Sequence, residues 1–260
     1  MSAAALTLPA DQIVAAVQQA AWPLVRISTF IAAAPVIGTH AVPRRVKTAL
    51  ALLLTLVLLP VLPPAPAVQA LSVPGLMTAI AQVLVGLTLA ISVRLVFMVL
   101  ELAGQIIGMQ MGLGFAAMVD PQNGAQVPVV GQFYVIFGTL AFLAGNGHLA
   151  LLQVLADSFQ RVPIAATGLD TQAMRMIVEL PQWLFISALS VALPAVVALL
   201  IVNLALGVMT RAAPQLNIFA VGMPITILIG AAVMLLTLPA LGEHYEALFA
   251  AGLALAAGGP

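Results

Sequence analysis

The sequence contains no cysteine, which excludes disulfides, thiolate metal sites and cysteine nucleophiles. Charged residues are also scarce. Lys, Arg, Asp and Glu together make up 6% of the 260 residues, whereas a soluble domain carries about 25%. Hydrophobic residues make up 63% of the chain, and the mean hydropathy is +1.19. This composition predicts an integral membrane protein.

Four stretches have no charged residue at all, and each is longer than the roughly 20 apolar residues that a helix needs to cross a bilayer. They are residues 48–93, 121–156, 180–210 and 212–242. The net charge is zero, and the scattered Lys and Arg form no basic patch, so nucleic-acid binding is excluded. The N-terminus lacks the basic region of a cleavable signal peptide, so we expect the first hydrophobic segment to remain in the mature protein.

Proline, glycine and charge divide the chain into helical segments. We expect helices at about 11–34, 46–62, 71–100, 128–144, 149–159, 181–210 and 215–241, an amphipathic surface helix at 169–180, and a short helix or frayed end after Glu243. Pro194 and Pro224 predict broken helices, whose freed backbone groups need surrounding protein. The predicted fold class is an all-α membrane protein: one domain, 1–260, of long helical hairpins broken by Pro and Gly and buried in an assembly.

Two groups of charged residues allow more than one interpretation. Arg44, Arg45 and Lys47 form the only dense basic cluster, which predicts a cytoplasmic loop and could instead contact a partner protein. Arg94 and Glu101 lie two helical turns apart. They either mark the membrane boundary or share a polar cluster.

Residues 104–128 are rich in glycine and methionine and almost uncharged. Gly104, Gly108 and Gly112 recur every four residues, which would line one helix face and let another backbone approach closely. Bulky side chains, including that of Met111, lie on the same face of the predicted helix as these glycines. Methionine repacks easily, so the segment suits either a tightly packed helix pair or a deformable seal. The candidate sealing residues are Met109, Met111, Gly112, Gly114, Phe115 and Met118.

No catalytic constellation is visible in the sequence. His40, His148 and His244 are far apart and none belongs to an H-E-x-x-H motif, and there is no G-x-S-x-G nucleophile elbow. We therefore expect no enzymatic activity, no cofactor and no metal. A small-molecule transporter remains an alternative, because such proteins also use broken helices and intramembrane polar residues.

Several segments together resemble the FliR family, the flagellar biosynthetic membrane proteins of the bacterial type III export gate, which have counterparts in virulence injectisomes. They are A-W-P-L-V-R-I-S-T-F at 21–30, P-R-R-V-K-T-A-L-A at 43–51, G-Q-I-I-G-M-Q-M-G-L-G-F-A-A-M-V-D-P at 104–121, F-L-A-G-N-G-H at 142–148 and N-L-A-L-G-V-M-T-R-A-A-P-Q-L-N-I-F-A-V-G-M-P at 203–224. The most specific piece contains Gln215 and Asn217, polar residues between two apolar segments that suggest a packing or partner role.

The resemblance implies a helical gate in the bacterial inner membrane, within the flagellar basal body. FliP-like and FliQ-like subunits would share it, a FlhB-like switch protein would contact it, and unfolded export substrates would pass through. It also implies that the helices need not span the bilayer individually. Family members place a plug loop in the channel, and the matching segment here is about 108–122, with Met111, Phe115 and Met118 as the closing residues.

Overall fold

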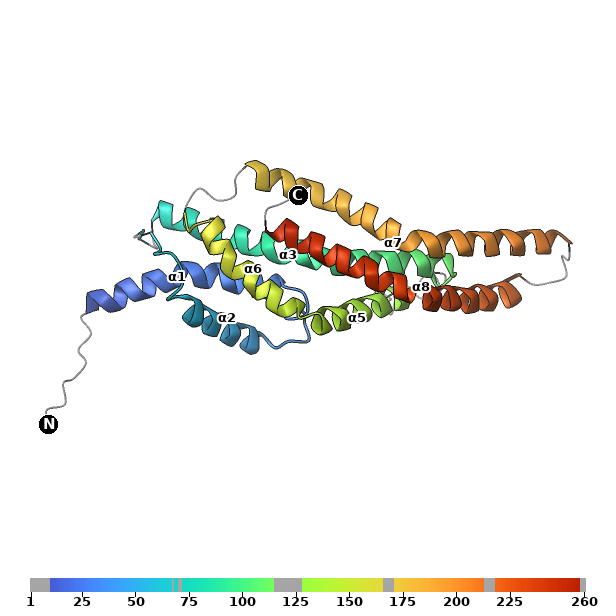
Figure 1. Ribbon diagram of the computed structural model, residues 1–260, viewed down its shortest axis with the longest axis horizontal. Helices are drawn as coiled ribbons and strands as arrows, with labels where there is room; N and C mark the ends of the chain where they lie inside the picture. The colour runs from blue at the N-terminus through green and yellow to red at the C-terminus, as the bar shows by residue number, and fades with distance from the viewer. Residues whose placement is uncertain are drawn as a thin grey trace, which may run out of the picture. The chain divides into compact units, whose positions relative to one another are not determined.

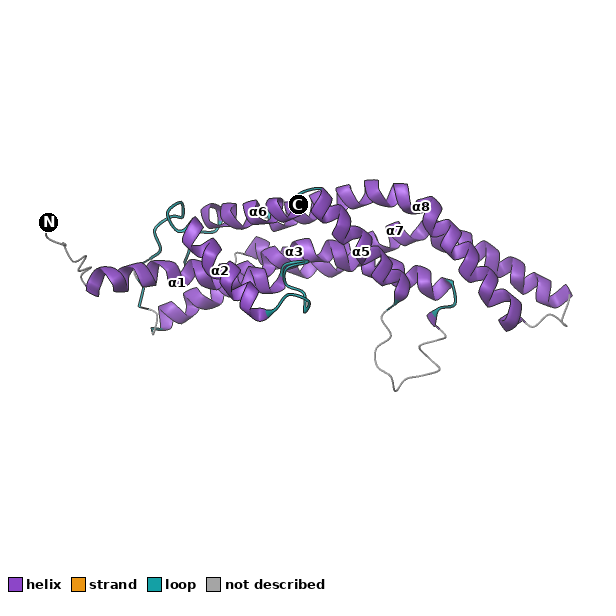
Figure 2. Cartoon of the chain, turned by 90° about the horizontal axis from the view of Figure 1, so that it is seen from below, coloured by secondary structure: helices purple, strands orange, loops and turns teal. Residues whose placement is uncertain are grey.

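The computed structural model describes residues 10–66, 68–69, 72–114, 128–165, 171–212 and 218–257. The described part of the chain consists of helices joined by turns and loops and has no strand (Figure 2). The prediction of an all-α membrane protein is confirmed. The helices follow one another in the order shown in Figure 1: α1 (Ala10–Ala33), α2 (Arg44–Leu58), α3 (Val73–Gln110), α5 (Val129–Ala144), α6 (Gly147–Arg161), α7 (Thr171–Ala212) and α8 (Ile218–Ala256).

Helix boundaries that depend on strong local signals agree with the prediction. Helix α1 ends at Ala33, one residue before the expected end, and α5 covers the expected stretch after Pro128. The G-N-G-H break also falls where expected. Asn146 adopts a left-handed backbone with φ 55°, a conformation that asparagine tolerates better than most residues.

Three predicted boundaries are wrong, because the helices continue through them. Helix α3 runs to Gln110, past the expected end at about residue 100. The expected surface helix at 169–180 is the first part of α7, which runs through Pro181 and Pro194. The stretch after Glu243 is the last part of α8, which contains Pro224 and Pro239. A proline removes a single helical hydrogen bond, and long apolar helices tolerate that loss when neighbouring groups compensate.

The chain divides into two compact units that draw on the same long helices. Unit 1 contains residues 1–94, 148–178 and 253–260, and unit 2 contains residues 95–147 and 179–252. That residues 1–260 form one domain stays a prediction. Within unit 1, α2 packs against α1.

The core of unit 2 contains a cluster of aromatic rings. Phe142 of α5 makes edge-to-face contacts with Phe97 of α3 and Phe249 of α8, in each case with 5.6 Å between ring centroids. Phe249 also stacks on Tyr245. Such pairs stabilise a core beyond the burial of their area, so they fix α3, α5 and α8 to one another within this unit.

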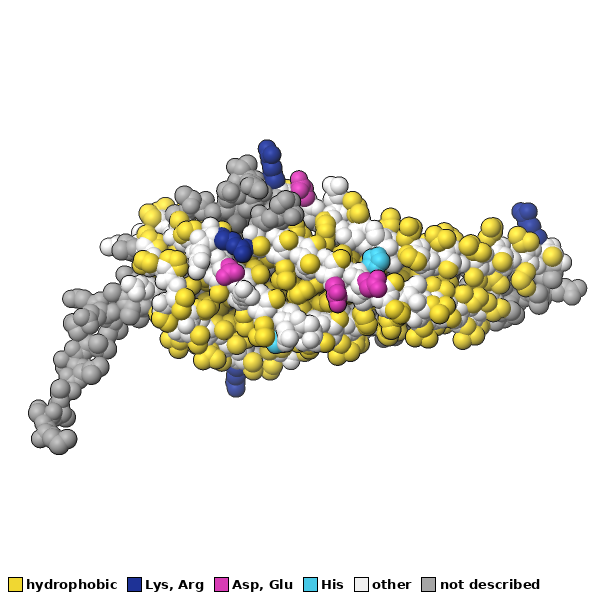
Figure 3. All heavy atoms as spheres, viewed as in Figure 1, with side chains coloured by type: hydrophobic (Ala, Val, Ile, Leu, Met, Phe, Trp, Pro, Cys, Tyr) yellow, Lys and Arg dark blue, Asp and Glu magenta, His cyan; other side chains and the backbone are white. Residues whose placement is uncertain are grey.

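Within the part of the chain that the structure describes, three helices are long and apolar enough to cross a membrane: α3, residues 177–212 of α7 and residues 222–256 of α8. The number rises to four if α5 and α6, which meet at a bend, count as one span. The face drawn in Figure 3 is covered mainly by hydrophobic side chains, with charged side chains scattered among them. An apolar surface of this extent agrees with a protein embedded in lipid or in an assembly.

Candidate functional site

The glycine face of α3 brings two backbones into direct contact. A β-carbon added at Gly104 would lie 2.6 Å from the Cα of Gly131 and 2.8 Å from the carbonyl oxygen of Val130, both in α5. A β-carbon at Gly131 would in turn lie 2.9 Å from the carbonyl oxygen of Glu101. At Gly108 the nearest atoms belong to the side chain of Val130 at 3.5 Å, an ordinary contact. The backbones of α3 and α5 therefore touch at the Gly104–Gly131 pair.

Gly112 does not continue this face, in contrast to the prediction. It lies two residues beyond the end of α3 at Gln110, with φ +82°, and no atom lies within 4 Å of its added β-carbon. Its N–H donates to the carbonyl of Met109 at 3.1 Å, and the N–H of Leu113 donates to the carbonyl of Gly108 at 3.1 Å. These two bonds and a left-handed glycine define a Schellman motif. Gly112 therefore ends α3 instead of packing within it.

The two methionines beside this helix end have opposite environments. The side chain of Met109 is 62% exposed, whereas that of Met111 is 3% exposed and lies against Gly230 of α8. Gly114 is exposed, and its nearest neighbour is the side chain of Met109. The side chain of Met109 therefore lies on the surface of unit 2, whereas that of Met111 lies in its interior. The remaining predicted sealing and partner residues, Phe115, Met118, Gln215 and Asn217, lie outside the described residues.

The three residues of the basic cluster at the start of α2 also differ in their environments. Arg44 and Arg45 are exposed. The ammonium group of Lys47 donates to the carbonyl oxygens of Gly38 at 2.8 Å and Thr39 at 2.9 Å, so it holds the turn between α1 and α2. That turn needs support, because Val36 has φ 63°, a strained conformation for a β-branched residue.

We expect Lys47→Met to lower the free energy of unfolding by about 1 kcal/mol, because two hydrogen bonds from a partly exposed ammonium are lost. The matched control is Arg45→Met, which removes an exposed charge from the same helix and should change stability by less than about 0.5 kcal/mol. Thermal unfolding of the purified chain in mild detergent measures both. Equal effects would contradict the structural role of Lys47.

Arg26, to which the sequence analysis assigned no role, is the most completely buried charged residue among those that the structure describes. Its guanidinium donates from Nε to Oε1 of Gln82 at 2.8 Å, from Nη1 to the carbonyl and hydroxyl of Ser158 at 3.0 and 3.3 Å, and from Nη2 to the carbonyl of Val162 at 2.8 Å. It also lies 4.2 Å from the ring centroid of Phe159. Arg26 thus connects α1, α3 and α6 within unit 1. The available signal was one arginine in an apolar helix, which predicts a residue that faces protein and finds polar partners.

Burial lowers the pKa of Arg26 to about 10, so the side chain stays protonated at neutral pH. Its charge is balanced by carbonyl, amide and hydroxyl oxygens and by the face of an aromatic ring. The four hydrogen bonds of the guanidinium all lie within unit 1, so Arg26 is a structural centre of this unit.

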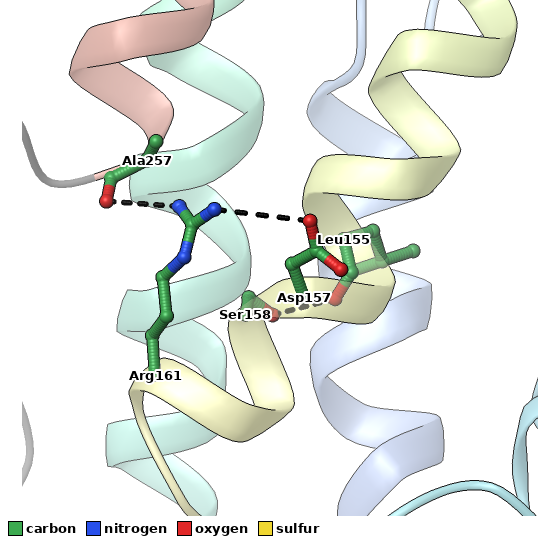
Figure 4. A network of polar contacts seen from close by, with 5 residues as sticks. All are labelled: Leu155, Asp157, Ser158, Arg161 and Ala257. Atoms are coloured by element: carbon green, nitrogen blue, oxygen red, sulfur yellow. Dashed lines mark hydrogen bonds and ion pairs between the residues drawn. The ribbon is translucent and has the colours of Figure 1, made fainter.

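Arg161 of α6, in contrast to Arg26, is an exposed arginine of unit 1. It donates to the carbonyl of Ala257 at 3.0 Å and lies 3.7 Å from the carboxylate of Asp157 (Figure 4). The side chains of this ion pair are 46% and 44% exposed, so the pair contributes little to stability.

Within the described ranges, no group of three or more His, Asp and Glu side chains is placed to hold a metal ion. His40 and His244 are exposed, and His148 is half-buried.

The chain was also compared with known proteins. The family described as "Bacterial export proteins, family 1" matches residues 17–252. The chain is similar to the flagellar biosynthetic protein FliR of Pectobacterium carotovorum, with 42% identity over 90% of this chain and 89% of the relative. FliR of Escherichia coli is 38% identical over 88% and 87%, and FliR of Bacillus subtilis is 32% identical over 78% and 79%. The chain therefore belongs to the FliR family of bacterial export proteins.

Proposed function

We propose that this chain is a subunit of the type III flagellar export gate in the bacterial inner membrane. Together with FliP-like and FliQ-like subunits it would form a channel for unfolded export substrates. The observation that carries the proposal is the match to FliR proteins along nearly the whole chain, because all three relatives named above are flagellar biosynthetic proteins.

The apolar faces of unit 2 support a role inside an assembly. On α7, large hydrophobic side chains that are each about half exposed or more recur every three or four residues: Phe185, Leu189, Leu193, Val197, Leu200, Leu204 and Val208. On α8, Leu228, Leu235 and Leu236 are each at least 67% exposed. Such a stripe is stable only against lipid or other apolar helices, which agrees with packing among membrane subunits.

The segment from Gly108 to about Gln122 would close the resting channel. Met109 is exposed and flexible, and a collar of flexible side chains can grip chains of any sequence while it blocks ions. Phe115 and Met118 would complete the seal. Met111, which the resemblance suggests as a third closing residue, is buried in unit 2, so we assign it an anchoring role.

The assembly is tested by co-expressing this chain with FliP-like and FliQ-like subunits and measuring the mass of the intact complex. We expect a stable heteromer that contains this chain. A monomer or homodimer that binds neither subunit would contradict the proposal and favour the transporter alternative.

The seal is tested with the double variant Phe115→Ala and Met118→Ala in cells that express the assembled gate. We expect ions and small dyes to leak across the inner membrane, because the variant removes the bulk of the plug while leaving the complex intact. The control is Phe133→Ala with Met98→Ala, which makes the same two changes at exposed positions outside the α7 stripe. Unchanged permeability in an assembled Phe115/Met118 variant would remove these residues from the seal.

A further inference from the structure

The C-terminal end of α3 is closed by an unusual set of partners. The last four carbonyls of any helix have no partner within the helix, and in apolar surroundings water cannot supply one. The Schellman motif satisfies the carbonyls of Gly108 and Met109. The carbonyls of Gln110 and Met111 remain.

Side chains from two other helices of unit 2 satisfy these two carbonyls. Asn203 of α7 donates from Nδ2 to the carbonyl of Gln110 at 3.3 Å. Thr226 of α8 donates from Oγ1 to the carbonyl of Met111 at 3.2 Å, a contact that bridges 115 residues of sequence. The same hydroxyl lies 2.9 Å from the carbonyl of Met223 in its own helix, so its proton can be shared between the two oxygens.

The side chain of Met111, next to these hydrogen bonds, is held in place by α8. Met111 lies on Gly230, one turn of α8 beyond Thr226, and a β-carbon added at Gly230 would lie 2.5 to 2.8 Å from three atoms of the methionine side chain. Gly230 and Thr226 are both buried. Because residue 230 is a glycine, α8 leaves space there for the side chain of Met111. We call this space the seat of Met111.

We propose that Asn203, Thr226 and Gly230 are positioning residues that hold the end of α3 and thereby stabilise the closed state of the gate. This inference rests on the proposed function, because the sealing segment begins where α3 ends. Movement of that end would leave two carbonyls unpaired in an apolar environment and would lift Met111 from its seat. The three contacts together, which we name the α3 cap, oppose opening until a substrate or partner compensates for them.

Hydrogen exchange on the full-length protein in detergent tests whether the α3 cap holds the helix end. In the variants Thr226→Val and Asn203→Leu, the amides of residues 111–113 should exchange roughly tenfold faster, the factor expected for the loss of one hydrogen bond. Thr226→Ser keeps the hydroxyl and should exchange like the unsubstituted protein. Thr210→Val is the control, because its hydroxyl bonds to the carbonyl of Gly207 in its own helix.

A second pair of variants tests the seat of Met111 without changing any polar group. Gly230→Ala should displace the methionine and accelerate exchange in the same peptide. Gly242→Ala is the matched control on α8, because no atom lies within 4 Å of its added β-carbon. Unchanged exchange in Thr226→Val and Gly230→Ala would overturn the α3 cap.

Permeability in cells then decides whether the α3 cap controls the gate. The chain replaces the FliR protein of a flagellated host, and both flagellar export and uptake of a small dye are measured. Dye uptake that rises in Thr226→Val and returns to the resting level in Thr226→Ser supports the inference, whereas faster exchange without increased uptake overturns it. Failure of the unsubstituted chain to restore export would overturn the proposed function, and the exchange rates would still decide whether the α3 cap holds the helix end.

Discussion

Replacing Arg26 with methionine is expected to destabilise unit 1 by about 3 kcal/mol. Methionine keeps most of the apolar stem but removes every donor. Oε1 of Gln82 and the half-buried carbonyl of Val162 then lose the arginine as a partner, and the carbonyl of Ser158 keeps only the N–H of Val162. Each buried acceptor left unpaired costs about 1 to 3 kcal/mol. The desolvation of the guanidinium, which lowers its pKa to about 10, opposes this loss but does not cancel it, because four bonds and an aromatic contact disappear together.

The conservative variant Arg26→Lys separates charge from geometry. Lysine keeps the positive charge, but a single ammonium cannot reach acceptors on both α3 and α6 as the forked guanidinium does. We therefore expect Arg26→Lys to be destabilised nearly as much as Arg26→Met. Thermal or denaturant unfolding in mild detergent gives the free energies.

Arg161→Met is the control, because it removes an arginine from the same unit whose ion pair is about half exposed. Its effect should stay below about 1 kcal/mol. Equal losses of stability in the Arg26 and Arg161 variants would contradict the role that we assign to the buried guanidinium.

The sequence was sufficient to predict those parts of the fold that depend on neighbouring residues. Low charge and long apolar runs predicted a helical membrane protein, and the turn residues at 145–148 placed the end of α5 correctly. Pro181 misled the prediction, because a proline usually marks a helix boundary, yet the apolar pattern on both sides supports one continuous helix.

Contacts between distant residues could not be predicted in this way. Arg26 meets Gln82 and Ser158, which are 56 and 132 residues away, and no local pattern joins them. The four-residue spacing predicted that Gly104 lines a helix face, and in the structure Gly104 lies against Gly131 of α5. It could not show that α3 stops at Gln110, which gives Gly112 a different backbone conformation and a different role.

The glycine face of α3 provides the second prediction with a large expected effect. Gly104→Ala should destabilise unit 2 by about 3 kcal/mol, the upper part of the usual range for overpacking. The atoms that the new methyl group meets belong to the backbone of Gly131 and Val130, at 2.6 to 2.8 Å, and a backbone cannot move aside as a flexible side chain can. Helices α3 and α5 would have to separate.

Gly108→Ala is the matched control, because it makes the same change one turn further along the same helix. Its methyl group would meet only the side chain of Val130 at 3.5 Å, and alanine favours a helix by about 1 kcal/mol over glycine. This variant should therefore be as stable as the unsubstituted chain or slightly more so. Unfolding in detergent compares the two directly. If Gly104→Ala proved as stable as Gly108→Ala, the close approach of α3 and α5 at Gly104 and Gly131 would not be a requirement of the fold.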